Sequence, residues 1–175
     1  MDLPHFLQKD FFDLDVDETY DVIVCSMVLN CVATPLQRGE MLVRCREHLR
    51  RGGFFFVMVP LRCLHASPFM TWDRFQAAME AAGFTLERHR NTPKVLLSCW
   101  RTAEWPWRIS LADIHGEERS NATVGDGNAA IDPRCVSWAE ARRWFASPPP
   151  QFVRTRGKGD TTQFGISFFP ARERG

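Results

Sequence analysis

Two long apolar segments joined by one helical segment constrain the fold of this chain more than any other feature. The first spans residues 20–27 and continues without a charged residue to Val32, and the second spans residues 54–61. Both are nearly continuous rather than alternating, which is typical of strands covered on both faces. We expect a right-handed βαβ unit with functional groups at the carboxyl ends of its strands, at residues 26–30 and 60–63.

The segment between the two strands has the signals of a helix. Thr34 is a good N-cap, and Pro35 occupies the first helical position, where its missing N–H costs nothing. Apolar residues fall on one face, and we expect the helix to run to Arg50, with Gly52 or Gly53 supplying the residue that ends it.

The next part of the chain predicts a second helix and a hairpin. Residues 62–70 are expected to form a loop, and Thr71 is the next N-cap. An apolar stripe follows, and Gly83 ends this helix. Residues 84–89 and 94–101 are predicted to form two antiparallel strands that close one side of the sheet.

The composition and charge bear on four questions: nucleic-acid binding, membrane association, the redox state of the cysteines and metal binding. The net charge of +1 gives no global field that favours nucleic acid. No apolar stretch is long enough to span a bilayer, and residues 1–12 lack the zones of a signal peptide, so we predict no membrane partner. The six cysteines are irregularly spaced without a C-x-x-C pair, which favours reduced thiols in an intracellular protein and no metal site.

After about residue 103 the chain changes character. Residues 116–128 are rich in Gly, Asn and Asp and predict a loop. A capping box at residues 137–140 predicts a short helix to about residue 146. Residues 163–169 are a candidate last strand, and the remainder either packs on the domain or is partly disordered.

Motifs of several enzyme classes do not occur in the sequence. It has no Gly-x-Gly-x-x-Gly, no Walker A motif, no Gly-x-Ser-x-Gly and no His-Glu-x-x-His. Hydrolase and nucleotide triphosphatase functions therefore have no support. Two features remain as candidates for a site: the uncharged strand-end loop from Ser26 to Asn30, and the acidic-aromatic pair Asp10-Phe11.

Several blocks together resemble the C-terminal half of a class I methyltransferase. They are Gln8-x-Asp10-Phe11, Tyr20-Asp21-Val22-Ile23, Ser26-Met27-Val28-Leu29-Asn30, Arg38-Gly39-Glu40-Met41-Leu42, Gly52-Gly53 and Pro60-Leu61-x-Cys63. They are most similar to the eukaryotic nucleolar family that methylates N1 of an adenine in large-subunit ribosomal RNA. The same family includes a sensor that binds S-adenosylmethionine in nutrient signalling.

The resemblance implies an α/β fold, an incomplete Rossmann-like sheet whose last two strands form an antiparallel hairpin. It implies a partial methyltransferase domain over residues 1–103, followed by a loop-rich C-terminal extension over residues 104–175. It also implies S-adenosylmethionine as cofactor, ribosomal RNA as partner and the nucleolus as location.

The resemblance also assigns roles to individual residues. Asp10 matches the acidic residue that binds the adenine amino group of the cofactor, with Phe11 offering its backbone N–H. Ser26 matches the loop along the methionine end, and Asn30 is the polar side chain placed to meet the target base. Asp2 resembles the ribose-binding acidic residue, although its distance to Asp10 is shorter than the family pattern. From the residues alone, Asp10 as a turn cap, and Ser26 and Asn30 as strand-end hydrogen-bonding groups, stay open.

The sequence departs from the family at its start. The glycine-rich loop that approaches the cofactor is absent, together with the first strand and its helix. The strand at Tyr20 then presents an apolar edge, which proteins avoid. We expect a truncated chain, a protein partner that completes the sheet, or another element in the gap, and favour the first. An enzyme, a cofactor sensor and a non-catalytic binding module of the same fold all stay open.

Overall fold

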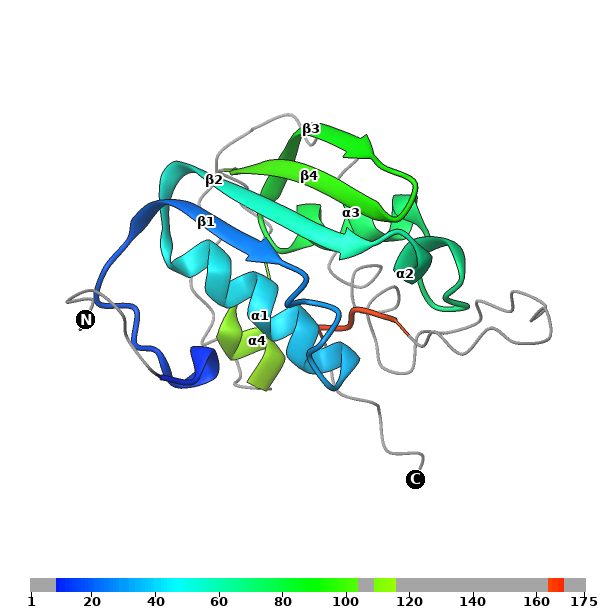
Figure 1. The fold of residues 1–175 in the computed structure, drawn as a ribbon. Coiled ribbons are helices and arrows are strands. Elements are labelled where there is room, and N and C mark those ends of the chain that lie inside the picture. The colour runs from blue at the N-terminus through cyan, green and yellow to red at the C-terminus, as the bar shows by residue number, and fades with distance from the viewer. Residues whose placement is uncertain (1–8, 104–108, 116–163, 169–175) are drawn as a thin grey trace, which may run out of the picture.

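A four-stranded mixed sheet organises the described part of the chain (Figure 1). The computed structural model describes residues 9–103, 109–115 and 164–168. The strands are β1 (Tyr20–Ser26), β2 (Leu49–Pro60), β3 (Phe84–Asn91) and β4 (Val95–Thr102), in the spatial order β1-β2-β4-β3. β1 and β2 are parallel, whereas β4 is antiparallel to both β2 and β3. The predicted βαβ unit and hairpin are confirmed.

The helices cover one face of this sheet (Figure 1). They include α1 (Pro35–Glu47), α2 (Arg62–His65), α3 (Trp72–Ala81) and α4 (Leu111–His115), and a short 3-10 helix, η1 (Phe11–Asp13), precedes β1. Alternate strand residues point into the helix-covered core, where the sheet contributes Cys25, Phe55, Val57, Val59, Leu96 and Trp100. The helices supply the opposite wall with Leu42, Val43, Phe75, Ala78 and Met79.

The start of α1 follows the sequence prediction. The Thr34 hydroxyl oxygen accepts a hydrogen bond from the Gln37 backbone N–H at 3.1 Å, and the Gln37 side chain accepts one from the Thr34 backbone N–H at 3.3 Å. This reciprocal capping box satisfies two donors that a helix N-terminus otherwise leaves unpaired. Pro35 occupies the first helical position as expected.

The predicted end of this helix is wrong. α1 ends at Glu47 with His48 as its C-cap, and residues 49–53 belong to β2. The physical reason is pairing with β1, because the Tyr20 backbone N–H donates to the His48 carbonyl at 2.8 Å and Tyr20 pairs with Leu49. Tertiary pairing therefore starts the strand before the glycines are reached.

Gly52 and Gly53 form part of a bulge instead of a helix end. The register passes from Tyr20–Leu49 to Val22–Phe54, so β2 contains extra residues opposite Asp21. Gly52 has a φ of 74°, which lies in the left-handed region that glycine adopts without strain.

The second helix follows its prediction closely, and the segment before it does not. The Thr71 side chain caps α3 by accepting from the Arg74 backbone N–H at 3.3 Å, and Gly83 follows the helix with a φ of 94°. The predicted loop over residues 62–70 is wrong in part, because it begins with α2. No side chain caps that single turn, so the sequence has no clear signal for it.

The short segment 164–168 packs beside α1 and is buried (Figure 1). The Ser167 backbone N–H donates to the Pro35 carbonyl at 2.9 Å, and an Arg38 guanidinium N–H donates to the Gly165 carbonyl at 2.8 Å. The same guanidinium lies 5.1 Å from the centre of the Phe164 ring. The described part of the predicted strand 163–169 therefore joins no sheet, because its backbone pairs with the first turn of α1.

Gly39 allows this close packing. A Cβ atom at this position would lie 2.1 Å from the Ser167 carbonyl oxygen and 2.9 Å from a ring carbon of Phe168. The Arg38-Gly39 pair therefore binds the downstream segment, with one residue donating hydrogen bonds and the other leaving space.

Two downstream pieces contribute to the same core as the sheet. Ile109, Ile114 and Phe168 are each buried within it. The division at residues 103 and 104 stays a prediction. The predicted loop over residues 116–128 and the predicted helix over residues 137–146 lie outside the described residues.

We predict that Gly39→Ala lowers the free energy of unfolding by about 1 kcal/mol or more, although alanine favours the helix by a similar amount. The added methyl group collides with the Ser167 carbonyl oxygen. Ser167 cannot easily move away, because its backbone N–H donates to the Pro35 carbonyl. Urea unfolding measures the change. Gln76→Ala on α3 is the control and should stay within about 0.5 kcal/mol of the original chain. An unchanged or higher stability of Gly39→Ala would contradict the packing described here.

Candidate functional site

The loop after β1 has a strained and well-defined backbone. Met27 follows the strand with a φ of 59°, a left-handed value that is uncommon outside glycine. Its backbone N–H donates to the Met58 carbonyl at 2.9 Å, and the Cys31 N–H donates to the Val28 carbonyl at 2.8 Å. Strain held by surrounding bonds is often found at functional sites. The predicted strand-end loop is thus a fixed turn at the carboxyl end of β1.

Asn30 carries an unused hydrogen-bond acceptor in this turn. Its side-chain oxygen Oδ1 is buried and has no hydrogen-bond partner among the described residues. Its Nδ2 donates weakly to the Cys31 sulfur at 3.5 Å, and that thiol donates to the Met27 carbonyl at 3.2 Å. A buried acceptor without a partner costs about 1–3 kcal/mol. A ligand that donates a hydrogen bond to this oxygen would recover that free energy on binding.

Ser26 lies at the last position of β1 and is exposed. Its hydroxyl donates to the thioether sulfur of Met58 at 3.4 Å. Thioether sulfur is a weak acceptor, so the hydroxyl can turn toward a better partner at little cost. The structure brings Ser26 and Asn30 onto one turn, as the sequence predicted.

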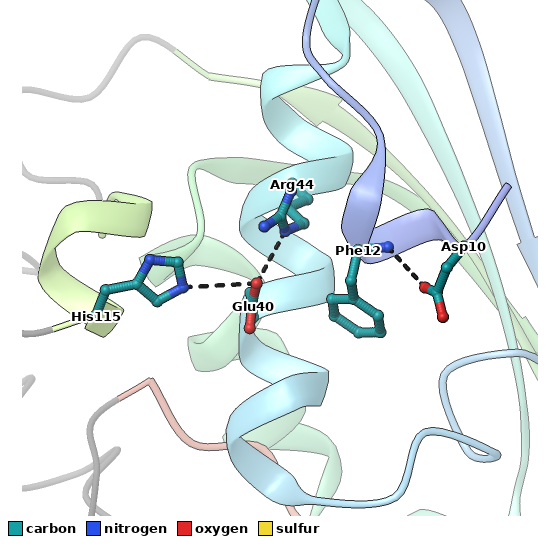
Figure 2. Close-up of polar contacts among 5 residues, drawn as sticks. All are labelled: Asp10, Phe12, Glu40, Arg44 and His115. Atoms are coloured by element: carbon teal, nitrogen blue, oxygen red, sulfur yellow. Dashed lines mark hydrogen bonds and ion pairs between the residues drawn. The ribbon is translucent and has the colours of Figure 1, made fainter.

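Asp10 caps the 3-10 helix that precedes β1 (Figure 2). Its Oδ1 accepts a hydrogen bond from the Phe12 backbone N–H at 2.9 Å. This is the turn-capping role that the sequence left open for Asp10. The second carboxylate oxygen and the Phe11 backbone N–H make no hydrogen bond within residues 9–103, 109–115 and 164–168.

The structure does not join Asp10 to the strand-end turn through any hydrogen bond of the described residues. The Phe11 ring instead packs against His48, with the ring centres 6.0 Å apart. Asp2, the candidate ribose-binding residue, lies outside the described residues. The proposed cofactor roles of these side chains stay predictions.

A charged cluster on α1 was not anticipated from the sequence. The Glu40 carboxylate accepts from Arg44 at 2.9 Å and lies 3.6 Å from the Nε2 of His115 on α4 (Figure 2). It therefore links α4 to α1, as Arg38 links segment 164–168 to the same helix. The spacing of Glu40 and Arg44 at i, i+4 was the available signal for one of these pairs. The Arg38-Gly39-Glu40 block thus has a structural explanation that does not involve a ligand.

Three buried thiols have structural rather than reactive surroundings. Burial raises the pKa of the Cys25 and Cys45 thiols above the ordinary value. Burial also raises the pKa of Cys63, although the positive charge of Arg38 acts in the opposite direction. A thiol with a raised pKa is a poor nucleophile at neutral pH, which supports the expectation of packed thiols.

Neither a metal cluster nor a membrane span occurs in the part of the chain that the structure describes. No group of three or more His, Cys, Asp or Glu side chains there is arranged to hold a metal ion. No helix among those residues has the length and apolar character needed to cross a bilayer.

Comparison with solved structures gives weak similarities to methyltransferases. A 1,6-didemethyltoxoflavin-N1-methyltransferase from Burkholderia thailandensis has 18% identity and a TM-score of 0.47, with 57% of this chain and 51% of that chain covered. The N-methyltransferase NodS from Bradyrhizobium japonicum has 15% identity and a TM-score of 0.43, covering 55% and 53%. The chain thus spans about half the length of these two proteins. No curated protein matches the sequence.

Comparison with protein families gives a match that covers more than half of the chain. Residues 2–129 match the family described as 25S rRNA (adenine(2142)-N(1))-methyltransferase, Bmt2. The matched range includes Asp10, the turn from Ser26 to Asn30 and the Arg38-Gly39-Glu40 block. This chain therefore belongs to the Bmt2 family of 25S rRNA (adenine(2142)-N(1))-methyltransferases.

Proposed function

We propose that this protein methylates N1 of an adenine in large-subunit ribosomal RNA, with S-adenosylmethionine as the methyl donor. The observation that carries the proposal is membership of the Bmt2 family over residues 2–129. The proposal includes a partial methyltransferase domain over residues 1–103 with an extension over residues 104–175, and action in the nucleolus.

The free polar groups of the site fit parts of an adenosyl cofactor. Asp10 has a second carboxylate oxygen that can accept from an adenine amino group, and the adjacent Phe11 N–H can donate to a ring nitrogen. The Ser26 hydroxyl, held by a weak sulfur acceptor, can turn toward the methionine end. When bound, S-adenosylmethionine supplies a methyl group on a positively charged sulfur.

The proposed reaction needs little acid or base catalysis from the protein. N1 of neutral adenine already carries a lone pair in the plane of the ring, so no proton has to be removed before it attacks. The protein mainly has to hold the base in position for an in-line approach. The unpaired Asn30 oxygen is an acceptor suited to the exocyclic amino group beside N1. A paired adenine would also have to leave its helix.

A non-catalytic module or S-adenosylmethionine sensor of the same fold is the second candidate. It is favoured by the position of β1 at the edge of the sheet, which leaves the carboxyl end of that strand without a neighbour on one side among the described residues. Calorimetry with S-adenosylmethionine and a methyl-transfer assay separate the candidates, since a sensor binds the cofactor without product formation.

Deleting the gene in its host tests the proposed reaction directly. We expect one N1-methyladenine of the large-subunit RNA to disappear when it is mapped by primer extension or mass spectrometry. Complementation with the original gene should restore it. An unchanged methylation pattern would reject the reaction.

We predict that Asn30→Ala lowers kcat by about 100-fold, because loss of the amino-group contact leaves N1 poorly aligned. The affinity for S-adenosylmethionine should not change, since Asn30 is proposed to meet the base. Methyl transfer to an RNA oligonucleotide and calorimetry measure the two quantities. Val28→Ala on the same turn is the control, because its exposed side chain makes no proposed contact. Equal activity of Asn30→Ala and the control would exclude the role of Asn30.

We predict that Asp10→Asn and Asp10→Ala both weaken cofactor binding by about tenfold, as expected for a lost hydrogen bond to a charged group. Asn can still accept from the Phe12 N–H as a cap, whereas Ala cannot. Only Asp10→Ala should therefore lower the thermal stability. If cofactor affinity follows stability, so that Asp10→Asn behaves like the original chain, Asp10 is a cap and not a ligand.

A further inference from the structure

His48 is a buried histidine whose side chain has an unpaired nitrogen. The residue is 5% exposed, and its Nε2 is buried without a hydrogen-bond partner among the described residues. A buried polar atom without a partner costs free energy, and a phenylalanine ring at this position would avoid that cost. The contribution of the imidazole to the domain therefore has to come from the packing of its ring.

The imidazole of His48 connects three elements. Its ring centre lies 6.0 Å from that of Phe11 in η1 and 6.5 Å from that of Tyr20 at the start of β1. The backbone of His48 caps α1, because its N–H donates to the Arg44 carbonyl at 3.0 Å. Its carbonyl accepts from the Tyr20 N–H at 2.8 Å. Regular secondary structure on both sides thus fixes the position of the ring.

The short helix η1 depends on packing of this kind, and it lies beside α1 (Figure 2). Its hydrogen bonds among the described residues run only within residues 10–14. They shape the turn but attach it to no other described element. Phe11 and Phe12 pack against the core, and the Phe11 ring meets His48. The place of η1 on the domain therefore rests on its side chains, and His48 provides one of the surfaces that hold them.

We propose that His48 is a positioning residue for the cofactor. Its ring holds η1 in place, and with it the Asp10 carboxylate and the Phe11 N–H, which are the proposed contacts of the adenine end of S-adenosylmethionine. A turn that moved freely before binding would have to be ordered on binding, which lowers affinity. The packed imidazole removes that cost in advance. The inference rests on the proposed function for the cofactor and adds the residue that fixes its two adenine contacts.

NMR relaxation of the full chain without cofactor tests whether His48 holds η1. His48→Ala should lower the order parameters of the Phe12 and Asp13 amides from about 0.85, typical of rigid backbone, to below about 0.6. His48→Phe keeps a ring in the same place and should leave them unchanged. His89→Ala is the matched control, because it removes an imidazole from a ring contact with Trp72 on β3, the opposite edge strand of the sheet. It should not change η1.

Calorimetry with S-adenosylmethionine tests the consequence for binding. His48→Ala should weaken the affinity by about tenfold, the loss also predicted for Asp10→Ala. His48→Phe should restore the original affinity, and its thermal midpoint should be no lower than that of the original chain, since the unpaired nitrogen is gone. His89→Ala should bind the cofactor as the original chain does.

The double variant Asp10→Ala with His48→Ala separates positioning from general destabilisation. If His48 acts through η1, its effect is already lost once Asp10 is removed, and the double variant should bind about tenfold more weakly than the original chain. Independent effects would add and give a loss of about a hundredfold, which would overturn the proposal.

Failure of this inference is distinguishable from failure of the proposed function. Unchanged order parameters of η1 in His48→Ala would overturn the positioning role. Unchanged cofactor affinity of His48→Ala, beside a tenfold loss in Asp10→Ala, would also reject the role of His48 alone. If the original chain binds no S-adenosylmethionine while His48→Ala still loosens η1, the proposed function is rejected and His48 is a structural contact only.

Discussion

The parallel pairing of β1 with β2 is the constraint on which the rest of the structure depends. It fixes the register from Tyr20–Leu49 to Ser26–Met58 and ends α1 earlier than its own sequence would. The extra residues of β2 then form a bulge at Gly52, where the backbone can adopt a left-handed conformation. The same pairing places the Met27 N–H against the Met58 carbonyl, and so positions the turn that carries Asn30.

α1 holds the downstream chain as well as the sheet. Arg38 donates to the carbonyl of Gly165, Gly39 leaves room for Ser167, and Glu40 approaches His115. Three consecutive residues therefore bind two distant segments through three different effects: a charged donor, a missing side chain and a contact between a carboxylate and an imidazole. Packing, rather than catalysis, accounts for this block, and the candidate site residues lie at the carboxyl end of β1 and at the start of η1.

The two faces of the sheet differ in burial among the described residues. The helix-covered face contains the large buried side chains, such as Phe55 and Trp100, and supplies the stability of the domain. The opposite face exposes part of the Phe56 side chain and reaches Ser26 at its edge.

The sequence alone determined the types of the main elements and the family. Continuous apolar runs, the Thr34 and Thr71 caps and Gly83 specified two helices, a parallel pair and a hairpin, because these signals act within a few residues of the chain. The same reading gave the Ser26–Asn30 turn, and the Bmt2 match agrees with the resemblance. Only the tertiary structure decided where α1 ends, that residues 164–168 pack on Pro35 and Arg38, and that Asp10 caps a turn. The first two outcomes depend on hydrogen bonds between residues far apart in sequence, which no local pattern specifies. The third is a local bond, but the sequence by itself was compatible with both a cap and a ligand role for Asp10.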